Sequence, residues 1–162
     1  MNFLSDNTAP VAPLSFGITK AGALAAEAVV FFDPHRAAFM AERRKRAGHF
    51  LSKHRFLAAQ FAAILADDRW LTLARDANLM ADRLSAKLAA VGLVPVWPVE
   101  ANLVFVVLPR VLDARLKAAG ARYYERTNTN LKLHPDEILA RLVTSFATKE
   151  DEIDRFVQLC KI

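Results

Sequence analysis

Apolar residues recur at three- and four-residue spacing through residues 55–66 and again after Asp67-Asp68. An amphipathic helix places such residues on one face, so this spacing limits the stretch to helical structure. The pattern extends back to Pro34, the aspartate pair can cap the second helix, and Gly92 ends it. We expect the apolar stripes to form a core or a subunit contact and not a ligand site.

Strand-like runs flank this helical stretch on both sides. Residues 14–18 and 27–32 are rich in β-branched and aromatic side chains, which favours two strands before it. Short connections and alternating strands and helices after Gly92 predict a small α/β sandwich, with its helices on one face of the sheet. The strands are expected over residues 93–97, 103–108, 121–125 and 139–146, and the helices over residues 110–119 and 149–160, the last with Thr148 as N-cap.

The same patterns divide the chain into four segments. Residues 1–13, polar and with two prolines, predict an N-terminal arm. Residues 14–33 form a two-strand unit and residues 34–92 a helical segment. Residues 93–162 form a C-terminal small α/β domain, and the length of 162 residues suits a modest core.

The composition narrows the class of protein. The chain is 54% apolar and 24% charged, so it can pack a core. Its longest apolar run is too short to cross a bilayer, and its first residues lack a secretory signal. The single cysteine, Cys160, excludes an internal disulfide and a cysteine-based zinc site. We expect a cytoplasmic protein that binds no metal.

Much of the net charge of +5 lies in the basic run at residues 43–46, with further basic residues up to Arg55. Such a run attracts nucleic acid, a membrane surface or a phosphorylated small molecule, whereas the simpler reading is a solvated helix face or a contact with an acidic neighbour. No aromatic stacking platform or DNA-binding motif accompanies the charge. Nucleic acid and membranes are therefore not expected partners.

Lys20 is the most suggestive single residue. It follows a strand end and lies among small residues, after Gly17 and Thr19 and before Gly22. Small neighbours let a planar group approach the backbone, and the Thr19 hydroxyl is placed to reach a phosphate. A lysine that forms a Schiff base must be partly neutral, which burial and nearby positive charge promote. Taken alone, the pattern is weak, because a lysine in a glycine-flanked turn is usually just solvated.

Several separate segments, in order, resemble one enzyme family. The run LSFGITKAGAL at residues 14–24, followed by EAVVFF at 27–32, is similar to the cofactor-lysine segment of the low-specificity L-threonine aldolases. These are β-eliminating lyases of fold type I that use pyridoxal phosphate. Further similarity to the family lies in residues 2–9, which resemble its opening, in residues 43–49 and 52–60, which resemble its helical region, and in residues 100–105 and 141–148, which resemble its C-terminal domain.

The resemblance implies a reaction and the residues that carry it. Lys20 would bind pyridoxal phosphate covalently, with Thr19 beside it, and Arg141 would bind the substrate carboxylate with help from Ser5. A guanidinium fork suits a carboxylate. The reaction would be retro-aldol cleavage of a β-hydroxy-α-amino acid, threonine or allo-threonine, to glycine and acetaldehyde, in a homo-oligomer. Arg141 as a surface ion pair and Ser5 as a turn residue remain the structural alternatives.

The sequence also departs from the family. There a long cofactor-binding segment separates the opening from the lysine strand, whereas here Pro13 leads directly to Leu14. An internal deletion, an abbreviated gene model and an engineered chain all explain this join. The missing segment supplies the carboxylate, the stacked ring and the phosphate-binding amides, so we expect weak cofactor binding and little activity. Two alternatives remain: a fragment that docks on a full-length aldolase subunit, or a basic nucleic-acid-binding module.

Overall fold

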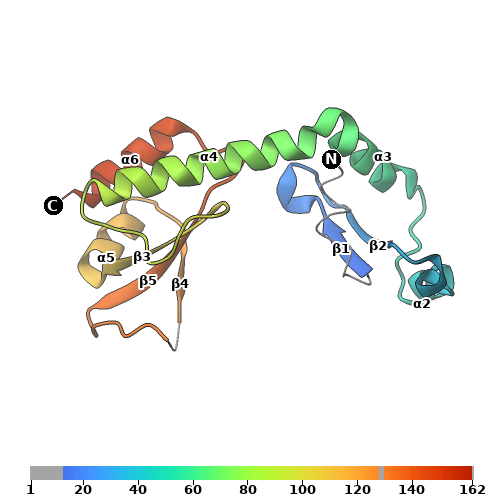
Figure 1. Ribbon diagram of the computed structural model, residues 1–162, viewed down its shortest axis with the longest axis horizontal. Helices are drawn as coiled ribbons and strands as arrows, with labels where there is room; N and C mark the ends of the chain where they lie inside the picture. The colour runs from blue at the N-terminus through green and yellow to red at the C-terminus, as the bar shows by residue number, and fades with distance from the viewer. Residues whose placement is uncertain (1–12, 128–129, 162) are drawn as a thin grey trace. The chain divides into compact units, whose positions relative to one another are not determined.

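The computed structural model describes residues 13–127 and 130–161. The chain forms two compact units, Met1–Trp70 and Leu71–Ile162 (Figure 1). Each unit has its own sheet, with two strands in the first and three in the second. Among the described residues, no helix is both long enough and apolar enough to cross a membrane.

A two-stranded antiparallel hairpin begins the first unit. Its pairing runs from Pro13 opposite Phe31 to Gly17 opposite Glu27, and the loop between the strands contains a short 3-10 helix. Two α-helices and two 3-10 segments follow the hairpin. The elements are β1 (Pro13–Gly17), η1 (Thr19–Ala21), β2 (Glu27–Phe31), η2 (Pro34–Ala37), α2 (Met40–Arg46), α3 (Arg55–Leu65) and η3 (Ala66–Asp68).

Few side chains of the first unit are buried. Phe16 of β1 contacts the rings of Phe61 and Trp70, each with 6.0 Å between ring centroids, so aromatic packing joins the hairpin to the helices. Other large apolar side chains face outward; Leu24 is 86% exposed and Phe39 is 74% exposed. The first unit therefore has only a small core of its own.

The second unit is a three-stranded antiparallel sheet with three helices. The strand order is β3-β5-β4, and the sheet register pairs Leu103 with Val143 and Tyr124 with Arg141. The first helix begins with the last two residues of the first unit. The elements are α4 (Arg69–Ala89), β3 (Leu103–Pro109), α5 (Arg110–Ala118), β4 (Tyr124–Arg126), β5 (Glu137–Val143) and α6 (Glu150–Cys160).

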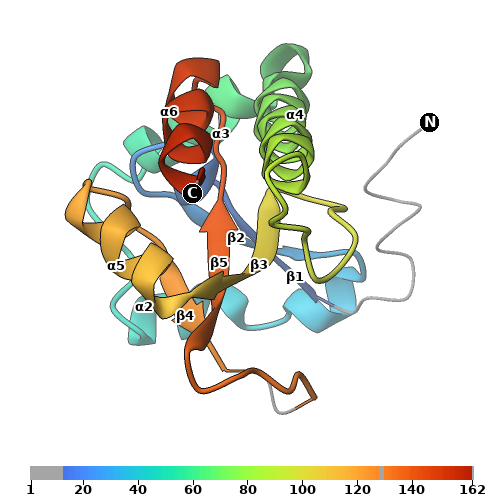
Figure 2. The ribbon, with the colours of Figure 1, turned by 90° about the vertical axis from the view of Figure 1, so that its left-hand side faces the viewer.

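One face of this sheet carries the core. Alternate residues of β3 are fully buried, among them Val104 and Leu108, and they join Leu88 of α4, Leu116 of α5 and Cys160 of α6 in one cluster. Figure 2 shows these helices around β5, and ion pairs join α4 to α6. The expected α/β class and the placement of the helices on one face are confirmed.

The helical stretch is more broken than its sequence pattern predicts. Between Pro34 and Gly92 it consists of two 3-10 segments and three α-helices. Gly48 and Lys53 both have positive φ, 76° and 57°, and they lie in the turn that separates α2 from α3. Left-handed residues end a helix, which accounts for the interruption.

The strand expected over residues 93–97 is wrong. Only one bridge forms there, between Pro95 and Val106, together with a hydrogen bond from Val96 N to Phe105 O of 2.8 Å. Proline has no N–H to donate to a strand ladder; Pro95 lies within this segment and Pro98 directly follows it. The segment is therefore a loop that runs beside β3.

Two strands and one helix start elsewhere than expected. β4 begins at Tyr124 and β5 at Glu137, where the sequence predicted residues 121 and 139. The N-cap of α6 is Lys149, whose N–H donates to the Glu152 carboxylate at 2.8 Å. The Thr148 hydroxyl instead accepts a hydrogen bond from Ser145 N at 2.9 Å, so the expected Thr148 cap is wrong.

Candidate functional site

Lys20 lies in η1, and its side chain is exposed. The loop around it is anchored by Ile18, which is only 1% exposed. Ile18 N donates to Ala26 O at 3.1 Å, and Ile18 O accepts from Ala21 N and Ala23 N at 3.0 and 3.2 Å. The backbone of one buried residue thus holds the loop at three points, while Lys20 itself is exposed.

The hydroxyl of Thr19 is already in use. It donates to Glu27 Oε1 at 2.9 Å and accepts from Ala26 N at 3.2 Å. Gly17 makes room for this carboxylate, because a Cβ at that position would lie 2.0 Å from Glu27 Oε2. The glycine, threonine and glutamate therefore act together to hold the loop in place.

Gln60 of α3 also holds the lysine loop, and sequence reasoning missed this role. Its Oε1 accepts hydrogen bonds from Leu24 N at 3.0 Å and Ala25 N at 3.2 Å. Its Nε2 donates to Phe56 O at 3.3 Å. A polar residue within the apolar stripe of residues 55–66 was the signal in the sequence.

The described loop does not by itself fit pyridoxal phosphate. It offers an accessible amine at Lys20, but the Thr19 hydroxyl is donated to Glu27, whose carboxylate would repel a phosphate placed there. The amides of Ala21, Ala23, Leu24 and Ala25 are likewise engaged. Among the described residues of this loop, an attachment point is present and a phosphate cradle is not.

Arg141 lies in β5, in the middle of the second unit's sheet. It pairs with Phe105 of β3 on one side and with Tyr124 of β4 on the other. Its guanidinium carbon is 5.2 Å from the centroid of the Tyr124 ring. Its Nε is buried and has no hydrogen-bond partner among the described residues. An unpaired buried donor is unfavourable, so this atom favours an incoming acceptor.

An open hollow of about 370 Å³ surrounds Arg141. Residues of β3 and β5 that alternate with the core positions contribute to it, so it opens on the face of the sheet away from the helices. Trp97 covers part of this face with its ring edge-on to Phe105, 5.2 Å between centroids. The lining residues are Trp97, Leu103, Phe105, Arg126, Thr127, Leu139 and Arg141.

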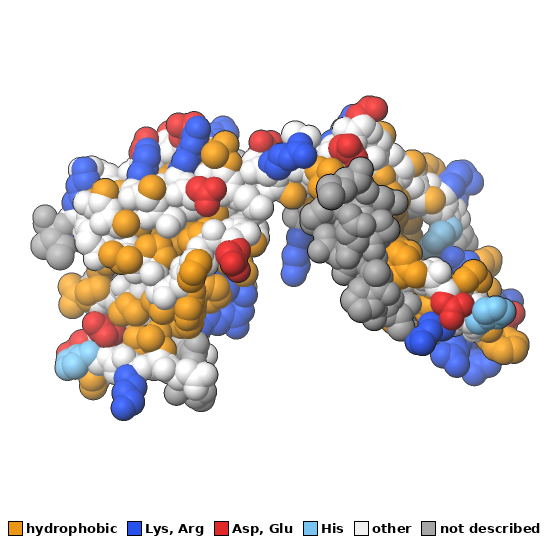
Figure 3. All heavy atoms as spheres, viewed as in Figure 1, with side chains coloured by type: hydrophobic (Ala, Val, Ile, Leu, Met, Phe, Trp, Pro, Cys, Tyr) orange, Lys and Arg blue, Asp and Glu red, His pale blue; other side chains and the backbone are white. Residues whose placement is uncertain are grey.

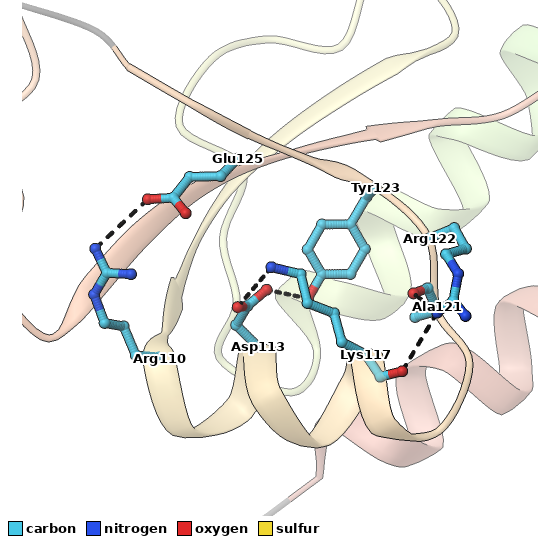
Figure 4. A network of polar contacts seen from close by, with 7 residues as sticks. All are labelled: Arg110, Asp113, Lys117, Ala121, Arg122, Tyr123 and Glu125. Carbon is cyan, nitrogen blue, oxygen red and sulfur yellow. Dashed lines mark hydrogen bonds and ion pairs between the residues drawn. The ribbon is translucent and has the colours of Figure 1, made fainter.

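A polar network on α5 fixes the orientation of β4. The Tyr123 hydroxyl donates to Asp113 Oδ1 at 2.8 Å, and Lys117 Nζ donates to Asp113 Oδ2 at 2.8 Å (Figure 4). Glu125 pairs with Arg110 at 3.5 Å. Because side chains alternate along a strand, anchoring Tyr123 and Glu125 toward α5 places Tyr124 and Arg126 on the other face of the sheet, where Arg126 lines the hollow.

The Tyr123 hydroxyl is held in its neutral form. Burial raises its pKa above the ordinary value of 10.0, and the hydrogen bond to Asp113 and the negative charge of that carboxylate raise it further. The phenol therefore stays a donor to Asp113 at neutral pH. The anchor of β4 is accordingly intact under ordinary conditions.

The predicted site residues are divided between the two units. Lys20 and Thr19 are neighbours in the first unit, and Arg141 belongs to the second. Ser5 lies outside the described residues. Their roles in cofactor and substrate binding stay predictions.

The basic run of residues 43–46 forms the exposed α2 helix. Figure 3 shows Lys and Arg side chains gathered at the position of α2. The guanidinium of Arg44 lies over the Phe50 ring at 5.3 Å. These features match a solvated helix face, one of the alternatives that the sequence allowed for the basic run.

Comparisons with known proteins assign a relationship. No family model matches the chain. It is 43% identical over 112 residues to the low specificity L-threonine aldolase of Pseudomonas aeruginosa and 39% identical over 112 residues to that of a Pseudomonas species. Each match covers 68% of this chain and 32% of the relative. The chain thus spans about a third of the length of these curated relatives.

The structure is also similar to that of Leishmania major threonine aldolase, with a TM-score of 0.86 and 29% sequence identity. That likeness covers 96% of this chain and 44% of the other. The α/β fold of this chain, with its two small sheets and its helices, is accordingly similar to part of that threonine aldolase structure. Over about two thirds of its length the chain is thus similar to low specificity L-threonine aldolases.

Proposed function

We propose that this chain is a threonine aldolase-like lyase polypeptide, in which the hollow at Arg141 binds the carboxylate of a β-hydroxy-α-amino acid. The observation that carries the proposal is the buried Nε of Arg141, unpaired among the described residues, beside an open hollow. A carboxylate accepts from two guanidinium N–H groups at once and would satisfy this donor. The names of the similar proteins support the substrate class.

Lys20 is the proposed attachment point for pyridoxal phosphate. The bound cofactor would supply an electron sink for retro-aldol cleavage of threonine or allo-threonine to glycine and acetaldehyde. Because the described loop lacks a phosphate cradle, we expect this chain alone to bind the cofactor weakly and to have little activity. Ser5 stays the proposed helper at the substrate carboxylate, and the cytoplasm stays the expected compartment.

Binding of L-threonine to the full chain tests the carboxylate site. Trp97 lines the hollow, so its NMR signals report on occupancy. Arg141→Gln should weaken threonine binding by roughly tenfold or more, because a charge-assisted fork is lost. The affinity of Arg141→Lys for threonine should lie between those of the unchanged chain and Arg141→Gln, since lysine keeps the charge and loses the fork.

Arg155→Gln is the matched control for that experiment. Arg155 is exposed on α6 and its loss lowers the net charge equally. Its affinity for threonine should equal that of the unchanged chain. If Arg141→Gln also binds threonine normally, the proposed role of Arg141 is wrong.

Trapping with borohydride tests the lysine. The full chain is incubated with pyridoxal phosphate, reduced and digested, and the modified lysines are identified by mass spectrometry. Lys20 should be modified in preference to Lys53, another exposed lysine of the first unit. Equal modification of both would refute the attachment role. A yellow form that survives dialysis and is lost in Lys20→Ala would refute weak binding.

Association with further copies of an aldolase chain is the proposed partnership. Large apolar side chains of the first unit are exposed, including Phe50 at 62% and Phe56 at 60%. Such exposure favours burial against another subunit. Light scattering of the purified chain should give a mass above that of a monomer, and a monomer at high concentration would contradict this. The comparisons favour the aldolase reading over a nucleic-acid-binding module.

A further inference from the structure

We infer that the hollow at Arg141 selects amino acids that carry a second carboxylate, and that Arg126 is the residue that selects them. The inference rests on the proposed function, because Arg141 is taken to bind the α-carboxylate. Arg126 has no part in the roles implied by the family resemblance. Its place in the fold follows from the register of β4 against β5.

The sheet register places Arg126 and Arg141 on the same face. Tyr124 pairs with Arg141, and Arg126 pairs with Leu139, so all four side chains leave the sheet on the side of the hollow. The guanidinium carbon of Arg126 is 5.7 Å from the centroid of the Tyr124 ring, and that of Arg141 is 5.2 Å from it. One aromatic ring therefore holds two cations at one hollow.

These two cations are not neutralised by neighbouring acids. Among the described lining residues of the hollow there is no Asp or Glu. Glu125, the nearest acid along the strand, is paired with Arg110 on the opposite side. No acidic partner of Arg126 is found in the part of the chain that the structure describes. Two like charges beside apolar walls repel each other, and a ligand with two negative charges relieves this repulsion.

The walls set the size and kind of ligand. Trp97, Phe105 and Leu139 are apolar or aromatic, which suits a small organic ligand with charges only at its ends. A monocarboxylic amino acid satisfies Arg141 alone. A dicarboxylic amino acid satisfies both arginines. Among β-hydroxy-α-amino acids, the preferred ligand is thus one whose side chain ends in a carboxylate.

Paired titrations of the full chain test this inference. L-Aspartate and L-alanine serve as probes, because they share the α-amino acid group and differ by one carboxylate. Aspartate should bind roughly three- to tenfold more tightly than alanine, an effect of the size expected for a partly exposed ion pair. Arg126→Gln should bring the ratio of the two affinities close to one, whereas Arg126→Lys should retain part of the preference.

The variants separate the possible results. Arg155→Gln controls for net charge and should keep the preference for aspartate. If Arg141→Gln weakens both probes while Arg126→Gln changes neither, the selectivity inference is wrong and the proposed function stands. If neither probe binds the unchanged chain, the selectivity inference and the proposed function are both wrong. Inorganic phosphate is the third probe; if it binds as tightly as aspartate and depends equally on Arg126, the site takes any dianion and the dicarboxylate assignment is wrong.

Discussion

The two units differ in how they hold their candidate residues. The hollow at Arg141 rests on a sheet whose other face is packed by three helices, with Leu108, Leu116 and Ile138 fully buried. The lysine loop rests on one buried isoleucine and a few polar contacts. Apolar burial is the larger source of stability, so the second unit should keep its geometry under conditions that loosen the first.

Removing a core side chain is the strongest test of this difference in apolar burial between the two units. Leu116→Ala deletes a fully buried side chain of α5 and should lower the free energy of unfolding by about 2–5 kcal/mol. Val29→Ala, at a position 57% exposed in the first unit, should change it by less than about 0.5 kcal/mol. Urea unfolding followed by circular dichroism gives both values. Equal losses would show that burial does not separate the units.

A buried hydroxyl offers a second, smaller effect in the same unit. Thr144 is 2% exposed, and its Oγ1 donates to Ala77 O at 2.7 Å. Thr144→Val keeps the shape and removes this second hydrogen bond to a helix carbonyl, so the free energy of unfolding should fall by about 0.5–1.5 kcal/mol. The exposed Thr72 of α4 is the control, and Thr72→Val should be neutral. Similar values for the two variants would contradict the importance of this hydrogen bond.

The lysine loop can be loosened locally through Gln60. Gln60→Leu removes the acceptor for two backbone amides, and those of Leu24 and Ala25 should exchange with solvent roughly three- to tenfold faster. Gln60→Glu keeps an acceptor and should restore slow exchange. Amides of β3 should not respond in either variant. Unchanged exchange at Leu24 and Ala25 in Gln60→Leu would show that other contacts hold the loop.

The smallest expected effect is a dependence on alkaline pH. The raised pKa of Tyr123 means that the folded state binds this proton more tightly than the unfolded state. Its stabilising contribution is therefore complete below the ordinary pKa of 10.0 and is lost as the pH rises above it. The loss should be under about 1 kcal/mol, because the hydroxyl is only partly buried.

Tyr123→Phe isolates that contribution. The variant has no ionisable hydroxyl, so the decline in unfolding free energy above pH 10.0 should be shallower than in the unchanged chain. Burial also raises the pKa of the Cys160 thiol, which adds an alkaline loss in both proteins. Denaturant titrations at several alkaline pH values measure the difference. Parallel curves would contradict the assigned role of Tyr123.

The strongest patterns in the sequence predicted the strongest elements. The apolar stripe after Asp68 became α4, and the β-branched run near Val104 became β3, because their periods persist over many residues. Residues 93–97 failed as a strand because proline removes ladder donors, which a count of apolar residues does not register. The N-cap of α6 lies at Lys149 because the Glu152 carboxylate accepts from Lys149 N. The Thr148 hydroxyl accepts from Ser145 N instead, and the sequence does not show this choice of partners.

The site was predictable only in part. Lys20 and Arg141 come from sequence motifs that match a family. Arg126 and Arg141 share the hollow because of the register of a three-residue strand, and so short an alternation does not fix a register in advance. Gln60 depends on a contact across 36 positions of the chain, which local patterns do not encode.

The buried cysteine of α6 makes local opening of the second unit measurable. Cys160 is the chain's single cysteine and is 2% exposed, with its sulfur among the side chains of the core. A thiol reagent can reach it only when the last helix lifts from the sheet. The labelling rate would therefore time that opening directly in the unmodified polypeptide, without any introduced probe.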